Sequence, residues 1–88
     1  MGVYKLSFRP SVEKDLRHLP ASASRLILKR IEQISTNPIS PKAIKLASSH
    51  NLYRLRAGDY RVVYSADHHA QEVMIHYVRH RREVYRSL

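Results

Sequence analysis

The sequence predicts an α+β fold in which a small antiparallel β-sheet carries an N-terminal αα-hairpin on one face. Apolar residues alternate with polar ones near the N-terminus and again in three segments after residue 51, which is typical of half-buried strands. Between these regions, apolar residues recur every three or four positions in two segments, which is typical of amphipathic helices. The predicted order is therefore β-α-α-β-β-β, and residues 1–88 are expected to form a single domain.

The first elements follow from this local spacing. Residues 4–8 alternate and predict a first strand, whereas the apolar positions within 12–19 predict a short helix that ends before Pro20. The apolar positions within 23–34 predict a second, longer helix. The tight link between the two helices predicts an antiparallel hairpin. The segment Pro38–Asn51 is a predicted connector.

Three strands are predicted after the connector, over residues 52–57, 60–65 and 72–79. Gly58-Asp59 and Asp67–Ala70 supply the turns between them. Alternation along these strands assigns one face to packing against the helices: Tyr53, Leu55, Ala57, Tyr60, Val62, Tyr64, Val73, Ile75 and Tyr77. The opposite face is predicted to carry Met74, His76, Val78, Arg54, Arg56 and Arg61.

Composition narrows the class of partner. Sixteen Lys and Arg against seven Asp and Glu give a net charge of +9, which favours nucleic acid, an anionic membrane surface or an acidic protein. Much of the charge lies on predicted strands rather than on one long helix, so nucleic acid is the favoured partner and a membrane is not expected. Cysteine is absent, and no apolar run reaches the roughly 20 residues that span a bilayer. We therefore expect a cytoplasmic protein.

The residues after position 53 carry seven arginines and no lysine. The planar guanidinium group suits phosphate oxygens better than the point charge of lysine does. Arg54, Arg56 and Arg61 flank one predicted hairpin, where they would repel one another without an anion between them. We interpret them as anion-binding residues, and the alternative is a solvated basic surface.

A second group follows the last strand and contains His80, Arg81 and Tyr85. Histidine exchanges protons near neutrality, and nearby cations favour the phenolate form of tyrosine. The alternative is that Tyr85 only anchors the C-terminal tail and that His80 is merely exposed. The adjacent pair His68-His69 lacks a third ligand at a standard spacing, so no metal site or other cofactor is expected.

The motifs Leu52-Tyr53-Arg54-Leu55-Arg56, Gly58-Asp59-Tyr60-Arg61-Val62-Val63-Tyr64 and His80-Arg81-Arg82-Glu83-Val84-Tyr85 resemble the RelE/ParE toxin superfamily, and more closely the RelE-type mRNA interferases. The resemblance covers nearly the whole chain. It implies a microbial-ribonuclease-like RelE fold and the toxin of a type II toxin–antitoxin system. It also implies a metal-independent endoribonuclease that enters the ribosomal A site and cleaves mRNA through attack of a 2′-hydroxyl on the adjacent phosphate. A dedicated RelB-like antitoxin would form a hetero-oligomer with the toxin.

The resemblance assigns roles to individual residues. Arg61 matches the position that stabilises charge on the scissile phosphate, Arg81 matches the leaving-group side, and Tyr85 matches a tyrosine implicated in activating the 2′-hydroxyl or stacking on a base. Substrate binding is assigned to Arg54, Arg56 and Arg82.

Arg54 and Arg56 stand where the best-studied relatives carry lysines. Arginine stays protonated and cannot serve as a base. The expected general base is therefore Tyr85 or His80.

Two other functions remain open from the sequence. ParE-type members of the same superfamily share the fold but inhibit DNA gyrase and cut no RNA; they generally lack the C-terminal tyrosine-bearing set. The third possible function is that of a non-catalytic relative that binds RNA through its backbone. Retention of Arg61, Arg81 and Tyr85 favours the interferase.

Overall fold

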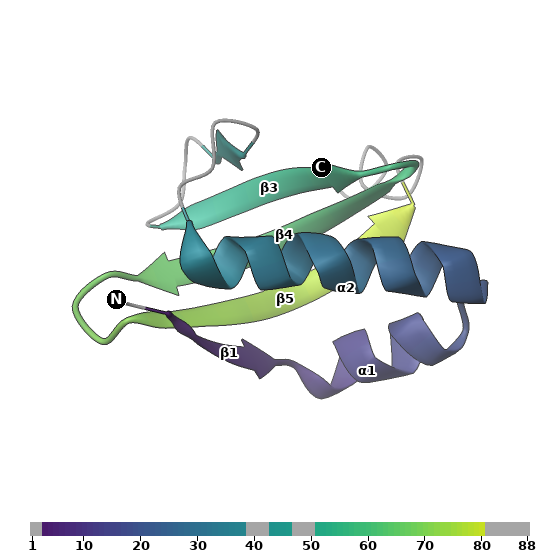
Figure 1. Cartoon of the computed structure of the whole chain (residues 1–88), viewed down its shortest axis with the longest axis horizontal. Helices are drawn as coiled ribbons and strands as arrows, with labels where there is room; N and C mark the ends of the chain where they lie inside the picture. The colour runs from purple at the N-terminus through teal and green to yellow at the C-terminus, as the bar shows by residue number, and fades with distance from the viewer. Residues whose placement is uncertain (1–2, 39–42, 47–50, 81–88) are drawn as a thin grey trace.

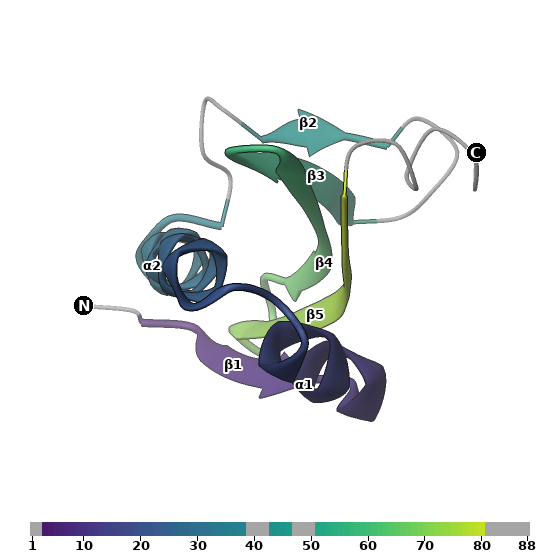
Figure 2. The ribbon, with the colours of Figure 1, turned by 90° about the vertical axis from the view of Figure 1, so that its right-hand side faces the viewer.

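The computed structural model describes residues 3–38, 43–46 and 51–80. Two helices and five strands follow one another in the order β1 (Lys5–Phe8), α1 (Pro10–Arg17), α2 (Ala21–Thr36), β2 (Ile44–Lys45), β3 (Leu52–Ala57), β4 (Tyr60–Asp67) and β5 (Glu72–His80). The α+β prediction is confirmed, and both helices lie on one side of the sheet (Figures 1 and 2). The short strand β2 was not predicted, because it lies in the segment expected to be a connector.

The helical hairpin forms where the sequence spacing predicted it. Proline occupies the first turn of α1, where its missing N–H costs no helical hydrogen bond. The longer helix α2 turns Ile27, Ile31 and Ile34 into the core, and all three are fully or almost fully buried. The Ser24 hydroxyl donates to a carbonyl at the end of α1, Leu16 O, at 2.8 Å and ties the two helices together.

The sheet is mixed rather than wholly antiparallel. Its strand order is β1-β5-β4-β3-β2, and every neighbouring pair among β2 to β5 is antiparallel. Strand β1 instead runs parallel to β5, with Lys5 opposite Glu72 and Phe8 opposite Ile75. The hairpin of α1 and α2 belongs to the long connection that follows β1, and a long connection is what a parallel neighbour requires.

One hydrophobic core lies between the helices and the inner face of the sheet. At its centre Tyr64 is fully buried, and its ring stacks on Tyr53 with centroids 5.4 Å apart. The Tyr64 hydroxyl donates to Pro38 O at 2.6 Å, so β4 is tied to the chain just after α2. Burial, with a smaller contribution from Tyr53, raises the pKa of Tyr64 to about 12.

Two turns connect the central strands at the predicted positions. Gly58 adopts a φ of +62°, and a Cβ built there would lie 3.2 Å from Leu26 Cδ2, so glycine suits this turn on both counts. In the second turn, the backbone N–H groups of His69 and Ala70 both donate to Asp67 Oδ1 at 3.0 Å. The hydrogen bond from Ala70, followed by that from His69, lowers the pKa of Asp67.

A β-bulge interrupts the pairing of β4 with β5. Val63 pairs with Tyr77, but the next residue of β4, Tyr64, pairs with Ile75, so His76 is an extra residue on β5. The alternation of β5 is reversed beyond that point. The sequence prediction for the end of this strand was therefore wrong: Val78 is buried in the core, whereas Tyr77 lies on the opposite face and is half-buried.

None of the helices within the described ranges is long and apolar enough to cross a bilayer.

Candidate nucleic-acid interface and active site

Three arginines stand side by side across three neighbouring strands. Arg56 on β3 lies opposite Arg61 on β4, and Arg61 in turn lies opposite Arg79 on β5. Residues directly opposite one another in antiparallel strands project from the same face, and neighbouring strands are about 4.8 Å apart. We call Arg56, Arg61 and Arg79 the arginine row. Its face is the one opposite the helices, as predicted for Arg56 and Arg61.

Backbone carbonyls hold the guanidinium groups of the arginine row. Arg56 Nε donates to Gly58 O at 3.3 Å, Arg61 Nη1 to Tyr60 O at 3.3 Å, and Arg79 Nη1 to Val78 O at 2.9 Å. Among the described residues, no carboxylate lies within ion-pair distance of Arg56 or Arg61. These two cations are therefore placed in advance for an external anion.

Arg54 lies on the same face, two residues before Arg56 on β3, and is half-buried. It is directly opposite Val63, which in turn pairs with Tyr77. Arg54 thus belongs to a second line of side chains beside the arginine row, in agreement with its predicted place on the functional face.

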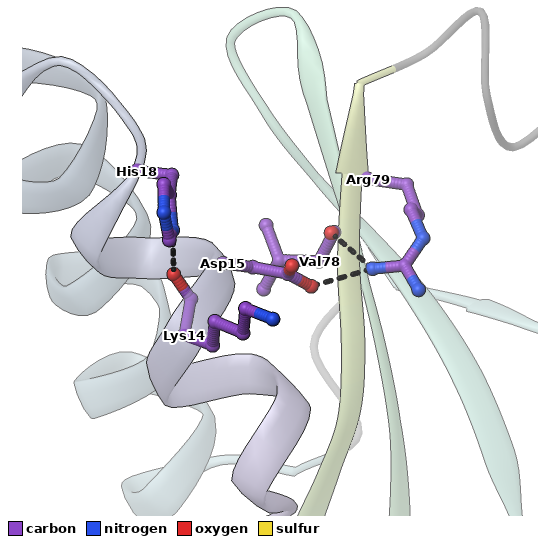
Figure 3. Close-up of polar contacts among 5 residues, drawn as sticks. All are labelled: Lys14, Asp15, His18, Val78 and Arg79. Carbon is purple, nitrogen blue, oxygen red and sulfur yellow. Dashed lines mark hydrogen bonds and ion pairs between the residues drawn. The ribbon is translucent and has the colours of Figure 1, made fainter.

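Arg79 has a carboxylate partner from a different element. Arg79 Nη1 donates to Asp15 Oδ2 on α1 at 2.6 Å, and both side chains are about one-third exposed (Figure 3). This contact joins the arginine row to the first helix across the part of the β5 edge that β1 does not cover. Sequence reasoning did not select Arg79 or Asp15, because an ion pair between residues so far apart in the chain leaves no local pattern.

Two further side chains lie on the face of the arginine row: His76, as predicted, and Tyr77, which the β-bulge brings there. His76 lies within hydrogen-bonding distance of Ser65 Oγ on β4, at 2.9 Å. Burial, with a smaller contribution from Arg9, lowers the pKa of His76 and favours its neutral form. The guanidinium carbon of Arg79 lies over the Tyr77 ring, 5.2 Å from its centroid. Tyr77 was expected on the apolar face.

His80 lies on the other face of the sheet. It pairs with Tyr60 at the start of β4, and the two rings meet edge to face with centroids 5.5 Å apart. Both rings line an open depression of about 590 Å³ beside α1, together with Lys14, Asp15, His18, Leu19, Val78 and Arg79. The structure therefore separates His80 from Arg61, although the two residues were expected to share one site.

The remaining predicted site residues, Arg81, Arg82 and Tyr85, lie outside the described residues. Arg81 follows directly after His80, the last residue of β5. Within the described ranges, no group of three His, Asp or Glu side chains is arranged to hold a metal ion.

The geometry is that of a surface for a phosphate-bearing chain. Three guanidinium groups lie in a line across the sheet: two have no carboxylate partner among the residues that the structure describes, and the third is paired with Asp15. Such fixed cations stabilise negative charge that develops on a phosphate, because they need not reorganise when the charge appears.

Comparison with known proteins identifies the family. The model of the ParE toxin family of type II toxin–antitoxin systems matches residues 6–85. The chain belongs to this family of toxins.

Relatives and solved structures place this toxin in the RelE/ParE superfamily. It is 29% identical over 85 residues to toxin RelE3 of Methanocaldococcus jannaschii, a match that covers 92% of this chain and 94% of the relative. The toxin also superposes on a chain of the archaeal RelE–RelB complex from Pyrococcus horikoshii with a TM-score of 0.80. That match has 30% identity and covers 90% of this chain and 96% of the other. A chain of the RelB–RelE antitoxin–toxin complex from Methanococcus jannaschii gives a TM-score of 0.75 at 27% identity, covering 93% and 98%.

The RelE fold predicted for this toxin is thus confirmed by structures that cover most of both chains. The arginine row lies on the three central strands of that fold, β3 to β5.

Proposed function

We propose that this toxin is a metal-independent endoribonuclease that cuts mRNA in the ribosomal A site and so inhibits translation in the cytoplasm. The observation that carries the proposal is the arginine row, which presents a line of fixed cations on the sheet face opposite the helices. Arg61, at the centre of the row, also matches the position to which RelE-type interferases assign stabilisation of the scissile phosphate. Geometry and resemblance therefore select the same residue.

The proposed reaction needs charge stabilisation more than covalent participation by the protein. The ribose 2′-oxygen attacks the adjacent phosphorus and loses its proton to a base. The bond from phosphorus to the 5′-oxygen then breaks, and that oxygen takes up a proton. The products are a 2′,3′-cyclic phosphate and a 5′-hydroxyl. Arg61 stabilises the extra negative charge on the phosphate oxygens, with Arg56 and Arg79 on either side of it.

The position of His80 argues against this residue as the base, and Tyr85 is therefore the proposed base. His80 packs against Tyr60 on the helix side of the sheet, away from the face that carries Arg61. Arginine is not a proton acceptor in proteins, so Arg54 and Arg56 are proposed to bind phosphate. In this proposal Tyr85 accepts the 2′-hydroxyl proton, Arg81 acts on the leaving-group side and Arg82 binds the RNA backbone.

A RelB-like antitoxin is the proposed protein partner. The related structures from P. horikoshii and M. jannaschii are toxin–antitoxin complexes in which a RelE chain is bound to RelB. An acidic antitoxin that covers the arginine row would neutralise a site that depends on positive charge placed in advance. We propose that the toxin is stored in such a hetero-oligomer.

Controlled expression in bacteria tests the nuclease. The ends of a reporter mRNA are mapped by primer extension for the wild type, Arg61→Ala and Arg25→Ala, where Arg25 is an exposed arginine on α2. We expect new cuts within translated codons from the wild type and Arg25→Ala. Arg61→Ala should reduce the rate of cutting by roughly 100- to 1,000-fold, the usual effect of removing a donor that stabilises transition-state charge. Blocking translation should remove the cuts. Equal cutting by Arg61→Ala would contradict the assigned role.

Gyrase inhibition is the alternative that the match to the ParE toxin family favours. Growth arrest with relaxed or broken DNA and without new mRNA ends would establish it in place of the nuclease. A chain that binds RNA, cuts none and arrests nothing would instead be a non-catalytic relative.

A further inference from the structure

We propose that Tyr77 stacks on a base of the RNA strand whose phosphates occupy the arginine row. This inference rests on the proposed endoribonuclease function and adds to it a residue that contacts the substrate. It depends on the bulge in β5, since without the extra residue Tyr77 would point into the core.

The bulge fixes which side chains share the RNA-facing surface. Because His76 is the extra residue, Tyr77 is opposite Val63 and Arg79 is opposite Arg61. The hydrogen-bonding contact of His76 with Ser65 Oγ, at 2.9 Å, joins the bulge to β4. A bulge thus redirects one aromatic residue and one arginine of β5 to the same face.

The Tyr77 ring is held beside the cations. Arg79 lies over the ring, 5.2 Å from its centroid, and Tyr77 and Arg79 are two residues apart, about 7 Å along a strand. A nucleotide bridges such a separation between its phosphate and its base. Although Arg79 lies over the ring, Tyr77 is only half-buried, so part of this side chain remains accessible to a ligand.

Tyr77 lies opposite Val63, which is buried on the outer face, and does not belong to the hydrophobic core between the sheet and the helices. Its neighbours on the outer face are Arg54, across the buried Val63, and Arg79. An aromatic ring among arginines that track a phosphate backbone is the arrangement by which proteins hold single-stranded nucleic acid.

Binding of uncleavable oligonucleotides to the full chain tests the inference. Two probes of equal length are compared by fluorescence anisotropy, both 2′-O-methylated to prevent cleavage: one carries ordinary bases and the other carries abasic residues. The proteins are the wild type, Tyr77→Phe, Tyr77→Leu and Met74→Leu. Met74 is a matched control, because it is exposed on the same strand and the same face. Thermal unfolding of each variant reports whether it is folded.

Stacking predicts that the wild type prefers the base-bearing probe by roughly 5- to 150-fold, which corresponds to the ~1–3 kcal/mol that stacking of one base on an aromatic residue contributes. Tyr77→Phe and Met74→Leu should keep this preference. Tyr77→Leu should lose it while binding the abasic probe as the wild type does, which also shows that Arg79 still contacts phosphate.

Other outcomes overturn one of the two ideas. An unchanged preference in Tyr77→Leu would sink the stacking role and leave the nuclease intact. Loss of the preference in Tyr77→Phe as well would show that the hydroxyl, not the ring, makes the contact. If the wild type bound neither probe, or bound both equally, the stacking role would fail, whereas the nuclease is tested separately by the mapping of mRNA ends.

Discussion

Tyr64 links the hydrophobic core to the strand that carries Arg61. It lies on the same strand as Arg61, is fully buried, and gives its hydroxyl proton to the carbonyl of Pro38. A buried hydroxyl without a partner is costly, and so is a buried carbonyl without one. This hydrogen bond therefore ties the strand that carries the central arginine to the segment after α2.

Replacing Tyr64 by Phe should lower the free energy of unfolding by about 1–3 kcal/mol, because Pro38 O is left without its donor. The phenol also links stability to alkaline pH. Its pKa is raised to about 12 in the folded chain, against about 10 in the unfolded chain. The folded state therefore keeps a proton that the unfolded state has lost, and stability falls as the pH rises from about 10 to about 12.

Urea unfolding at pH 8 and at pH 11 checks both parts of this prediction. Tyr64→Phe should be less stable than the wild type at pH 8, and the gap should narrow at pH 11. An equal gap at the two pH values would contradict the assigned titration, and no gap at either would contradict the hydrogen bond's role.

Single residues also show where sequence reasoning succeeded and failed. Arg54, Arg56 and Arg61 were placed on the correct face because strand alternation is local and no bulge interrupts β3 or the start of β4. Tyr77 and Val78 were assigned to the wrong faces because one extra residue in β5 exchanges the two faces beyond it. Valine at 78 and tyrosine at 77 are both acceptable on an inner face, so composition alone does not reveal the bulge.

At the scale of elements, the helices were predictable and the sheet only in part. The apolar stripes of α1 and α2 are visible within a few residues of sequence, and both helices form there. The parallel pairing of β1 with β5 joins residues 5 and 72, and no short-range pattern encodes such a contact. Strand β2 has only two residues, both exposed, which is too little for an alternating pattern.

His76, on the bulged strand β5, should make the free energy of unfolding decrease in mildly acidic solution. Burial lowers the pKa of His76 in the folded chain, followed in effect by the charge of Arg9. The unfolded chain, with an ordinary histidine near pH 6.5, therefore binds a proton that the folded chain does not. The contribution of His76 to stability is present above about pH 6.5 and is lost as the pH falls below that value.

Melting temperatures between pH 5 and pH 8 measure this effect. His76→Gln should flatten the decline below pH 6.5, because glutamine does not titrate. His69→Gln, at an exposed turn position, is the matched control and should follow the wild type. A decline that is as steep in His76→Gln as in His69→Gln would place the titrating group elsewhere.

At the scale of the whole molecule, the net charge is +9, and the number of phosphates that the basic surface neutralises sets how strongly RNA binding depends on salt. Each phosphate neutralised releases counterions, and the logarithm of affinity falls linearly with the logarithm of salt concentration. If the arginine row contacts the backbone, Arg56→Ala should reduce the magnitude of this slope by about 0.7, the value for one contact to a single strand.

Titrations of an uncleavable oligonucleotide at several salt concentrations provide the slope. Arg25→Ala removes the same charge from α2 and should leave the slope close to that of the wild type. An equal reduction of the slope in both variants would mean that RNA binding depends on the net charge alone and not on the arginine row.

The pairing of the first strand with the last also affects the stage of synthesis at which the toxin can fold. Strand β5 supplies Arg79 and pairs with β1, so neither the arginine row nor the five-stranded sheet can form before residues 72–79 have been made. Contacts between such distant parts of a chain are also slow to form. A partly translated copy therefore lacks the arginine row, and under the proposed function the order of translation itself delays toxicity.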